Sequence, residues 1–276
     1  MDKTFKHSGN LGDIIYSLPT IIALGGGILY LNNRMDELRI NKKAPLPPSV
    51  LTADMMSEII ELLKLQPCLS DVRFYNNEPI DFDLDKFREF YSRYNRCSHL
   101  AYGHLNTFGV KFNLNLPWLE NIKPIYVKDI IVNRSVRNLS PSNKFNYSAL
   151  RGYEDRCVFI GFDSEYKKFL SDAGLNIQRH APTTILEFAG IIKGSRLFVG
   201  NQSLGFALAE AMKHPRALEI SYLFPNCLPQ SMNGHIKLSK GLVKRALCGQ
   251  KKIKLHPIID KICASARYEC NKYEYK

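Results

Sequence analysis

Short apolar runs alternate with helical segments along this chain, and the alternation limits the fold more than any other feature of the sequence. It is clearest in the second half, where the expected strands are Val158–Phe162, Leu175–Ile177, Leu197–Val199 and Ala217–Ile220 and the expected helices are Glu165–Asp172, Thr184–Ile192 and Ser203–Lys213. Gly174 and Gly194 follow two of these helices, where a helix C-terminus favours glycine. Such alternation is typical of a parallel sheet in an α/β protein.

The first half repeats this pattern less regularly. A strand at Thr4–His7, a helix at Asp13–Leu24 and a strand at Ile28–Leu31 together predict a βαβ unit. The pattern then predicts a helix capped by Thr52, a strand at Val72–Tyr75, a helix at Asp83–Tyr94 and a strand at Ile130–Val132. The polar segment 133–148 that follows is a candidate boundary. We predict two Rossmann-like domains that face each other across a cleft, at residues 1–127 and 128–256, and a C-terminal helix and basic tail at 257–276.

The charge of the chain indicates which partners it prefers. Its 276 residues include 38 Lys and Arg against 26 Asp and Glu, a formal net charge of +12. A basic surface attracts nucleic acid, anionic lipid or a phosphorylated ligand, although an ordinary solvated surface explains the charge equally well. Seven scattered cysteines without a Cys-x-x-Cys pair argue against a disulfide framework and a zinc knuckle. No signal peptide or transmembrane segment is visible, so we expect a cytoplasmic protein.

The loop between the first expected strand and helix is the first candidate site. Gly9, Asn10 and Gly12 lie in it, at the edge of the sheet where open α/β proteins bind ligands, and glycine lets a ligand approach the backbone closely. A third glycine at the spacing of a dinucleotide-binding motif is missing, which argues against an NAD-dependent oxidoreductase even though Asp36 lies near the expected ribose-binding position. Asp13 begins the helix, either as an N-cap or as a general base.

A second candidate loop follows the expected strand Leu197–Val199. Its amide and hydroxyl side chains are Asn201, Gln202 and Ser203, and the unpaired N–H groups of the next helix favour an anion such as a diphosphate there. Glu210, two turns along that helix, is either a hydrogen-bond acceptor for a ribose diol or a solvated carboxylate. After the strand Ile130–Val132 come Arg134, Ser135 and Arg137, and arginine donates bidentately to phosphate.

Two other groups of residues raise the question of a metal site. Asp81, Asp83 and Asp85 imitate an Asp-x-Asp motif of the kind that holds a metal ion, but acidic residues before a helix are expected as caps. His99 and His104 lie in an aromatic segment without a carboxylate or thiol pattern for zinc, and they could line an acceptor cleft. We expect no metal site.

The motifs HSGNLGDIIYSLP at residues 7–19 and LFVGNQS at 197–203 together resemble the ADP-heptose:lipopolysaccharide heptosyltransferase family, nucleotide-sugar glycosyltransferases of the GT-B fold. The resemblance implies that Asp13 is the catalytic base, that the Gly-Asn motif contacts the donor, and that no metal is needed. It places the acceptor mainly on the first domain and the nucleotide sugar on the second. Gln202, Leu204 and Ala207 replace the Asp, Gly and His usual in the family, so their donor contacts do not carry over.

The sequence thus predicts glycosyl transfer with inversion from a nucleotide-diphosphate sugar, without a cofactor. Asp13 takes the proton of the acceptor hydroxyl, while Arg134, Arg137 and the helix start at 201–203 stabilise the leaving diphosphate. The acceptor is a bacterial surface glycan or lipopolysaccharide-type molecule, reached at the inner membrane face. Two alternatives stay open, namely a phage-type DNA glycosyltransferase acting on a hydroxymethylated base and a catalytically inactive module that binds a nucleotide sugar. The oligomeric state is not predicted.

Overall fold

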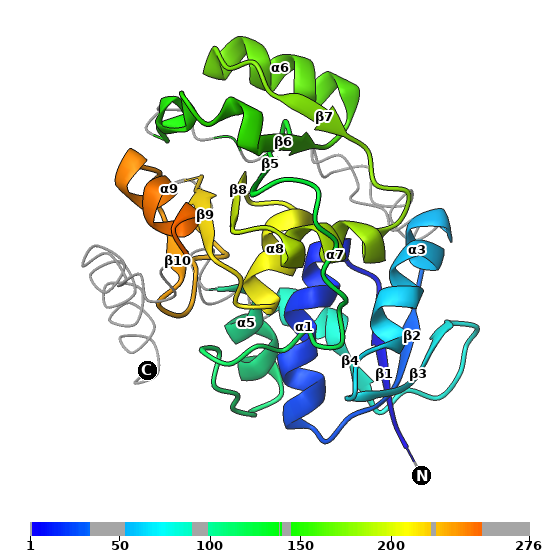
Figure 1. The fold of residues 1–276 in the computed structure, drawn as a ribbon. Coiled ribbons are helices and arrows are strands. Elements are labelled where there is room, and N and C mark those ends of the chain that lie inside the picture. Colours follow the sequence, from blue (N-terminus) through cyan, green and yellow to red (C-terminus); the bar gives the residue numbers. More distant parts are fainter. Residues whose placement is uncertain are drawn as a thin grey trace.

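Two parallel β-sheets with a shared layer of helices between them form the architecture of this protein (Figure 1). The structure is a computed structural model, and it describes residues 2–33, 53–89, 99–137, 139, 145–221 and 225–249. All strand pairings within both sheets are parallel, as the alternation of strands and helices predicts. The α/β class is therefore confirmed.

The first sheet has the order β3-β2-β1-β4. Its strands are β1 (Lys3–His7), β2 (Gly27–Leu31), β3 (Leu69–Phe74) and β4 (Phe82–Asp83). The helices of this half are α1 (Leu11–Ala23), α3 (Ala53–Lys64) and α5 (Leu100–Thr107), and the 3-10 turn η1 (Leu84–Lys86) follows β4. The βαβ unit predicted for the N-terminus is present as β1, α1 and β2.

The second sheet has the order β10-β9-β8-β5-β6-β7. Its strands are β5 (Ile130–Asn133), β6 (Cys157–Ile160), β7 (Gln178–His180), β8 (Leu197–Asn201), β9 (Arg216–Glu219) and β10 (Gly234–His235). Its helices are α6 (Asp163–Ala173), α7 (Ile185–Gly194), α8 (Leu204–Ala211) and α9 (Lys240–Leu247), and the 3-10 turns are η2 (Tyr147–Leu150) and η3 (Glu154–Arg156). Central strands buried on both faces read as apolar runs, which is why the sequence located most of them.

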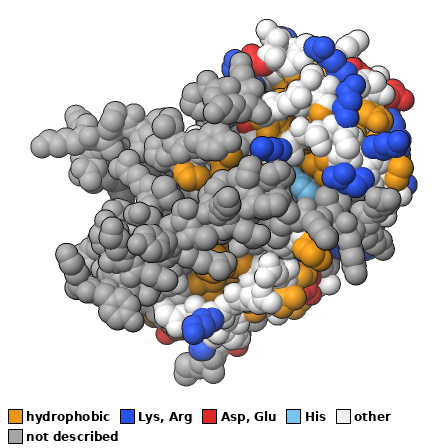
Figure 2. Space-filling view, turned by 90° about the vertical axis from the view of Figure 1, so that its left-hand side faces the viewer, with side chains coloured by type: hydrophobic (Ala, Val, Ile, Leu, Met, Phe, Trp, Pro, Cys, Tyr) orange, Lys and Arg blue, Asp and Glu red, His pale blue; other side chains and the backbone are white. Residues whose placement is uncertain are grey.

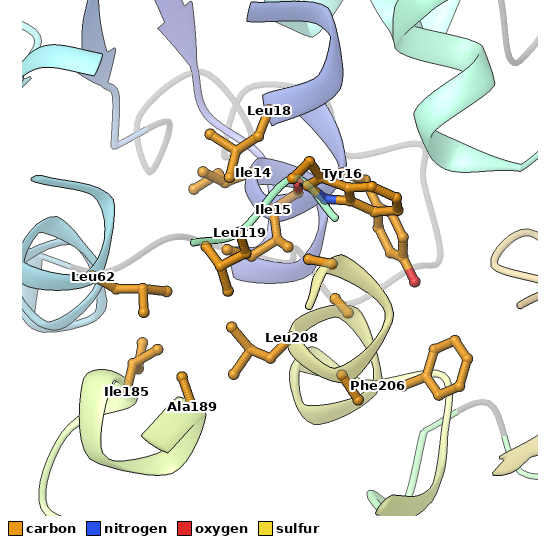
Figure 3. Packing of buried hydrophobic residues seen from close by; sticks show 14 of the residues in the cluster. Ile14, Ile15, Tyr16, Leu18, Leu62, Leu119, Ile185, Ala189, Phe206 and Leu208 are labelled. Atoms are coloured by element: carbon orange, nitrogen blue, oxygen red, sulfur yellow. Dashed lines mark hydrogen bonds between the residues drawn. The ribbon is translucent and has the colours of Figure 1, made fainter. Parts of the chain in front are cut away.

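One hydrophobic core joins the two halves. Side chains of α1, α3, α7 and α8 point toward one another in the helical layer, among them Ile15, Leu62, Ile185 and Leu208 (Figure 3). Trp118 links α1 and α8 in this layer by hydrogen bonds. Its indole N–H donates to the Ile15 carbonyl at 3.1 Å, and its backbone N–H donates to the carbonyl of Ala211 at 2.9 Å. The helices that begin at the two predicted loops therefore pack directly on each other.

Two expectations about the second half are wrong in detail. The strand predicted at Leu175–Ile177 begins only at Gln178, because the buried apolar side chains of Leu175 and Ile177 fill the second core cluster ahead of the sheet pairing. Gly174 has the expected left-handed backbone, with φ of 59°. Gly194 serves a different need, since a Cβ atom there would lie only 2.2 Å from the backbone oxygen of Ile125.

Several predictions are not tested by these residues. The first sheet ends with Asp83 and the second begins with Ile130, so the boundary at 127/128 lies between them, but the domain division stays a prediction. The Thr52 cap, most of the helix expected up to Tyr94 and the C-terminal helix and tail at 257–276 fall outside the described residues. Of the cysteines that the structure describes, Cys68, Cys157, Cys227 and Cys248 are free thiols.

Candidate active site between the two sheets

Asp13 lies in the first turn of α1, directly after the loop that follows β1. Asn10, rather than Asp13, is the N-cap residue, so the N-cap interpretation of Asp13 is wrong. The Asp13 carboxylate instead accepts a hydrogen bond from the backbone N–H of Asn10, and its side chain is 18% exposed. Backbone donors at a helix start and the helix dipole hold a carboxylate in place there.

Burial raises the pKa of Asp13 above its ordinary value, and three neighbours oppose that rise. They are the Arg88 guanidinium, the Asn10 N–H and the Arg137 guanidinium, whereas the negative charge of Asp85 acts in the same direction as burial. The Arg88 Nη2 atom is 3.8 Å from the Asp13 Oδ2 atom. A carboxyl group whose proton affinity is balanced in this way suits general base catalysis.

The glycines of the first loop have separate packing roles. A Cβ atom on Gly9 would lie 2.5 Å from the imidazole of His7 and 2.6 Å from Arg88 Nη2, so only glycine leaves room for these side chains. A Cβ atom on Gly12 would lie 3.8 Å from the Cβ atom of Ala207 in α8. Gly12 lies in the first turn of α1, so its predicted place in the loop is wrong, and the start of α1 lies close to the helix that follows the second predicted loop.

Asn201 belongs to β8, and the prediction that Gly200 and Asn201 are loop residues is wrong because both pair with neighbouring strands. The Asn201 side chain is fully buried and accepts from the Ser135 N–H at 2.9 Å. Its amide donates to the carbonyls of Ser135 at 3.0 Å and of Arg137 at 2.6 Å. Asn201 therefore fixes the loop after β5, and the exposed Arg137 of this loop acts electrostatically on Asp13.

Ser203 and Gln202 fix the other residues around the start of α8. The Ser203 hydroxyl donates to Asn133 Oδ1 at 2.7 Å. Gln202 accepts from the Ser221 N–H at 2.7 Å and donates to Asn226 Oδ1 at 2.6 Å. The structure thus brings all three polar residues of the predicted loop to the carboxyl edge of the second sheet. Their side chains form hydrogen bonds with other residues of the protein.

Arg134 is held by two carboxylates. Its Nε atom donates to Glu219 Oε2 at 2.6 Å, and its Nη1 atom donates to Asp172 Oδ2 at 2.7 Å. The Tyr147 hydroxyl also donates to Glu219, at 2.9 Å. These partners were missed by sequence reasoning, although a glutamate that ends an apolar strand is a signal for one. Phosphate binding by Arg134 stays a prediction. A bound phosphate would have to share the Arg134 guanidinium with Glu219 and Asp172.

Glu210 is fully buried, so the interpretation as a solvated carboxylate is wrong. It pairs with Lys213, with the fully buried Arg216 at 2.5 Å, and with the Gln230 N–H at 3.1 Å. Burial lowers the pKa of Lys213 to about 8, opposed by Glu210 and reinforced by Arg216. The ribose contact predicted for Glu210 is not tested, and these three partners already engage its oxygens.

The acidic motif after β3 does not converge on a common point. Asp81 accepts from Thr4 N–H at 2.8 Å, Asp83 caps η1 by accepting from the Asp85 N–H, and Asp85 accepts from Ser8 and Arg88. The capping interpretation of Asp83 is therefore confirmed. Within the described residues no group of three His, Cys, Asp or Glu side chains could hold a metal ion, and the expected metal independence stays untested.

The two histidines of the aromatic segment are buried beside the first loop. The His99 Nδ1 atom accepts from the Ala101 N–H at 3.2 Å, and burial lowers the pKa of His99 to about 4. His104 stacks on Phe87 with ring centroids 4.0 Å apart, and neither of its ring nitrogens has a hydrogen-bond partner among the described residues. A role of His99 and His104 in an acceptor cleft stays a prediction.

Sequence reasoning missed Arg88 and the role of Asp85, which contact the first loop from η1 and from the residues directly after it. The signal was the i,i+3 spacing of the two residues, since that spacing brings side chains together in a helical turn. Their approach to Asp13 depends on the pairing of β4 with β1, which no local pattern encodes.

The surface of the molecule carries its basic side chains unevenly. On the face in Figure 2, Lys and Arg side chains gather mainly over the upper part, which is the second sheet and its helices in Figure 1. Positive charge there favours an anionic ligand. Among the helices that the structure describes, none combines the length and apolar character needed to cross a bilayer.

Comparison of the sequence with known protein families and with curated proteins gives no match. Solved structures do match. Escherichia coli heptosyltransferase WaaC with ADP-2-deoxy-2-fluoro heptose aligns with a TM-score of 0.53 and 10% identity over 90% of this chain and 99% of that chain. A glycosyl transferase family 9 protein from Veillonella parvula DSM 2008 aligns with a TM-score of 0.48 and 12% identity over 98% and 97% of the two chains. This chain therefore has the fold of the heptosyltransferase WaaC, and the predicted GT-B type fold is confirmed.

Proposed function

We propose that this protein is a glycosyltransferase that moves a sugar from a nucleotide-diphosphate sugar to an acceptor hydroxyl. The observation that carries the proposal is the position of Asp13, a partly buried carboxylate whose proton affinity Arg137 from the opposite sheet helps to set. Base and cation thus come from different halves, an arrangement that suits a transfer between an acceptor held by one half and a donor held by the other. The WaaC fold supports the proposal, because the matching WaaC structures contain ADP-2-deoxy-2-fluoro heptose and ADP.

In the proposed reaction, the acceptor oxygen attacks the anomeric carbon from the side opposite to the diphosphate. The acceptor proton passes to the Asp13 carboxylate, the bond from the anomeric carbon to the diphosphate oxygen breaks, and the nucleoside diphosphate leaves with the electron pair. This displacement inverts the anomeric carbon. Arg137 and the N–H groups at the start of α8 stabilise the charge that develops on the leaving group, because preorganised donors act most strongly where water is excluded.

The acceptor we propose is a lipopolysaccharide-type glycan, met at the cytoplasmic face of a membrane. The net charge of +12 and the basic surface over the second half support an anionic acceptor or donor. The same charge was the ground for the DNA-modifying alternative, and the structural neighbours give that alternative no further support. A non-catalytic module is disfavoured by the well-positioned Asp13.

A donor screen tests the proposal first. Calorimetric titration with UDP-, ADP-, GDP-, CMP- and dTDP-sugars should give saturable binding of one nucleotide class. The bound donor should then be consumed when a truncated lipopolysaccharide acceptor is added. Binding with no transfer or hydrolysis of any donor would favour the inactive module instead.

Asp13→Asn tests the role of the base. The variant should fold and bind the donor as the wild type does, because asparagine keeps the shape of the side chain. Turnover should fall about 10²- to 10⁴-fold, the usual contribution of a general base. Asp71→Asn is the matched control, since Asp71 pairs with Arg73 at the surface of β3. Full turnover by the Asp13→Asn enzyme would refute the assignment of the base.

A further inference from the structure

The segment from Asp85 to Arg88 contacts the first loop and is not part of any donor or acceptor site described above. We propose that Asp85 anchors Arg88 and that Arg88 positions Asp13 and keeps it ionised for proton transfer. Both are positioning residues, because they act on the reaction only through Asp13. This inference rests on the proposed function for its effect on turnover, but the contact itself can be tested without activity.

Asp85 is tied to the backbone at the start of the candidate site. Its side chain is 5% exposed, and it accepts from the Ser8 N–H at 3.2 Å and from the Ser8 hydroxyl at 2.5 Å. Burial alone would raise the pKa of Asp85, but His7, Arg88 and the Ser8 hydrogen bond together hold it well below its ordinary value. Asp85 is therefore a fixed negative charge across the pH range of interest.

Arg88 extends from this anchor toward Asp13. Its Nη1 atom donates to Asp85 Oδ1 at 2.5 Å, and its Nη2 atom reaches within 3.8 Å of Asp13 Oδ2. The guanidinium also lies over the Phe87 ring, with its central carbon 4.7 Å from the ring centroid. One planar cation therefore spans two carboxylates, and the Phe87 ring and Asp85 limit its freedom.

Gly9 shows how closely the loop and the arginine are fitted. A Cβ atom at this position would lie 2.6 Å from Arg88 Nη2 and 3.1 Å from the Asp13 Cβ atom. Any larger residue at position 9 would push the guanidinium away from the carboxylate. Glycine at position 9 thus leaves room for Arg88 to approach Asp13.

The charged and titratable groups that face Asp13 come from several elements. They are Arg88 and Asp85 from the η1 segment, Arg137 from the loop after β5, and the Cys227 thiol. Burial raises the pKa of Cys227 to about 12, so this thiol is neutral. Arg88 and Arg137 are the cations of this set, and Arg137 is exposed to solvent while Arg88 is anchored. Arg88 is therefore the cation of this set that combines a fixed anchor, Asp85, with a close approach to Asp13, at 3.8 Å.

The test compares Arg88→Met and Arg88→Lys with the wild type. The carboxyl ¹³C shift of Asp13, assigned with Asp13→Asn, reports its titration in the ligand-free protein. In Arg88→Met the midpoint should rise by about one pH unit or more, since an adjacent opposite charge lowers a carboxyl pKa by about that amount. In Arg88→Lys, which keeps the charge, it should rise less. Arg88→Gln replaces Arg88→Met if the latter does not fold.

Turnover gives the second readout. The acid limb of the pH–rate profile should move upward in Arg88→Met by as much as the Asp13 midpoint, so that the loss of activity is largest at acidic pH and shrinks as pH rises. Arg73→Met is the control, because Arg73 pairs with Asp71 at the surface of β3 and its loss should leave both midpoints unchanged.

Two results would overturn the inference. One is an Asp13 midpoint in Arg88→Met equal to that of the wild type. The other is an equal fractional loss of turnover at every pH, which is the signature of a merely structural arginine. If Asp13→Asn keeps full turnover, the proposed base is wrong, yet the ¹³C titration still decides whether Arg88 controls the Asp13 carboxylate.

Discussion

Replacement of Glu210 by glutamine should lower the free energy of unfolding. Any weakening of donor binding should be secondary to this loss of stability. Glu210 and Arg216 are both completely buried, and Lys213 is the second cation on the same carboxylate. The variant keeps the volume of the side chain but removes the negative charge between two buried cations. Leaving a buried charge without its partner costs about 3–5 kcal/mol.

The cost is set mainly by Arg216. Lys213 can lose its proton, because burial already lowers its pKa to about 8 and the loss of Glu210 lowers it further. Arg216 cannot, since a guanidinium stays protonated in proteins. Its remaining partners among the described residues are the carbonyl oxygens of His214 at 2.9 Å and Gln230 at 2.6 Å and the Ser231 hydroxyl at 3.4 Å, which solvate the charge only in part.

Urea denaturation followed by circular dichroism measures the effect. With an m value of about 3 kcal/mol/M, a loss of about 3–5 kcal/mol lowers the midpoint by about 1 to 1.7 M. Adding Arg216→Met to Glu210→Gln should recover part of the loss, because the unpaired charge is then gone. Asp163→Asn is the matched control, since the exposed Asp163–Lys167 pair contributes at most about 1 kcal/mol.

The experiment distinguishes a structural role of Glu210 from a role in binding the donor. A Glu210→Gln protein within about 1 kcal/mol of the wild type would refute the argument that the ion pair supports the fold. If that stable protein also bound the nucleotide sugar more weakly, the ribose contact predicted from the sequence would gain support instead.

Two other substitutions test burial and packing. His99→Asn keeps an N-cap for α5 but removes a buried imidazole whose pKa is lowered by burial from 6.5 to about 4. As pH falls from 6.5 to 4, the imidazole gains a proton in the unfolded chain before it does so in the folded protein. The wild type should therefore lose about 3 kcal/mol more stability than the variant over this range. Equal acid sensitivity in urea titrations at both pH values would contradict this. Gly194→Ala should lower the melting temperature through a clash with the Ile125 backbone, at a cost of about 1–3 kcal/mol. A Cβ atom on Gly241 in α9 would make only ordinary contacts, the nearest with Arg245 Nη1 at 3.5 Å, so Gly241→Ala should raise stability by up to about 1 kcal/mol. Calorimetry that ranks these glycine variants in the opposite order would refute the packing argument.

The βα alternation was predictable because buried parallel strands and amphipathic helices each leave a local pattern in the sequence. The pattern failed where a residue is buried but takes no part in strand pairing. Leu175 and Ile177 are examples, because they are buried like strand residues but precede β7. It also assigned Gly200 and Asn201 to a loop, because glycine and asparagine disfavour strands in general. Pairing with β5 on one side and β9 on the other overrides that preference.

The charged residues were harder to interpret than the apolar ones. Asp13 could be found because it follows a strand and two glycines, and its motif is local. Glu210 has the same local signal as any solvated helix carboxylate, and only the position of Arg216 at the start of β9 explains its burial. A contact between charges far apart in the sequence depends on sheet order, which periodicity does not encode.

In both sheets, a strand pairing places the segment after one of the strands so that it influences Asp13. Pairing of β1 with β4 sets Lys6 opposite Asp83, so the next residues along each strand bring the Asp85–Arg88 segment beside the first loop. Pairing of β5 with β8 sets Asn133 opposite Gly200, so Asn201 can bind the loop that carries Arg137. Packing of α1 on α8, which approach each other closely at Gly12 and Ala207, then joins the two halves. Because the two arginines reach Asp13 from different sheets, a movement of one sheet relative to the other changes the charge around the base, whereas a local change within either sheet affects only one of them.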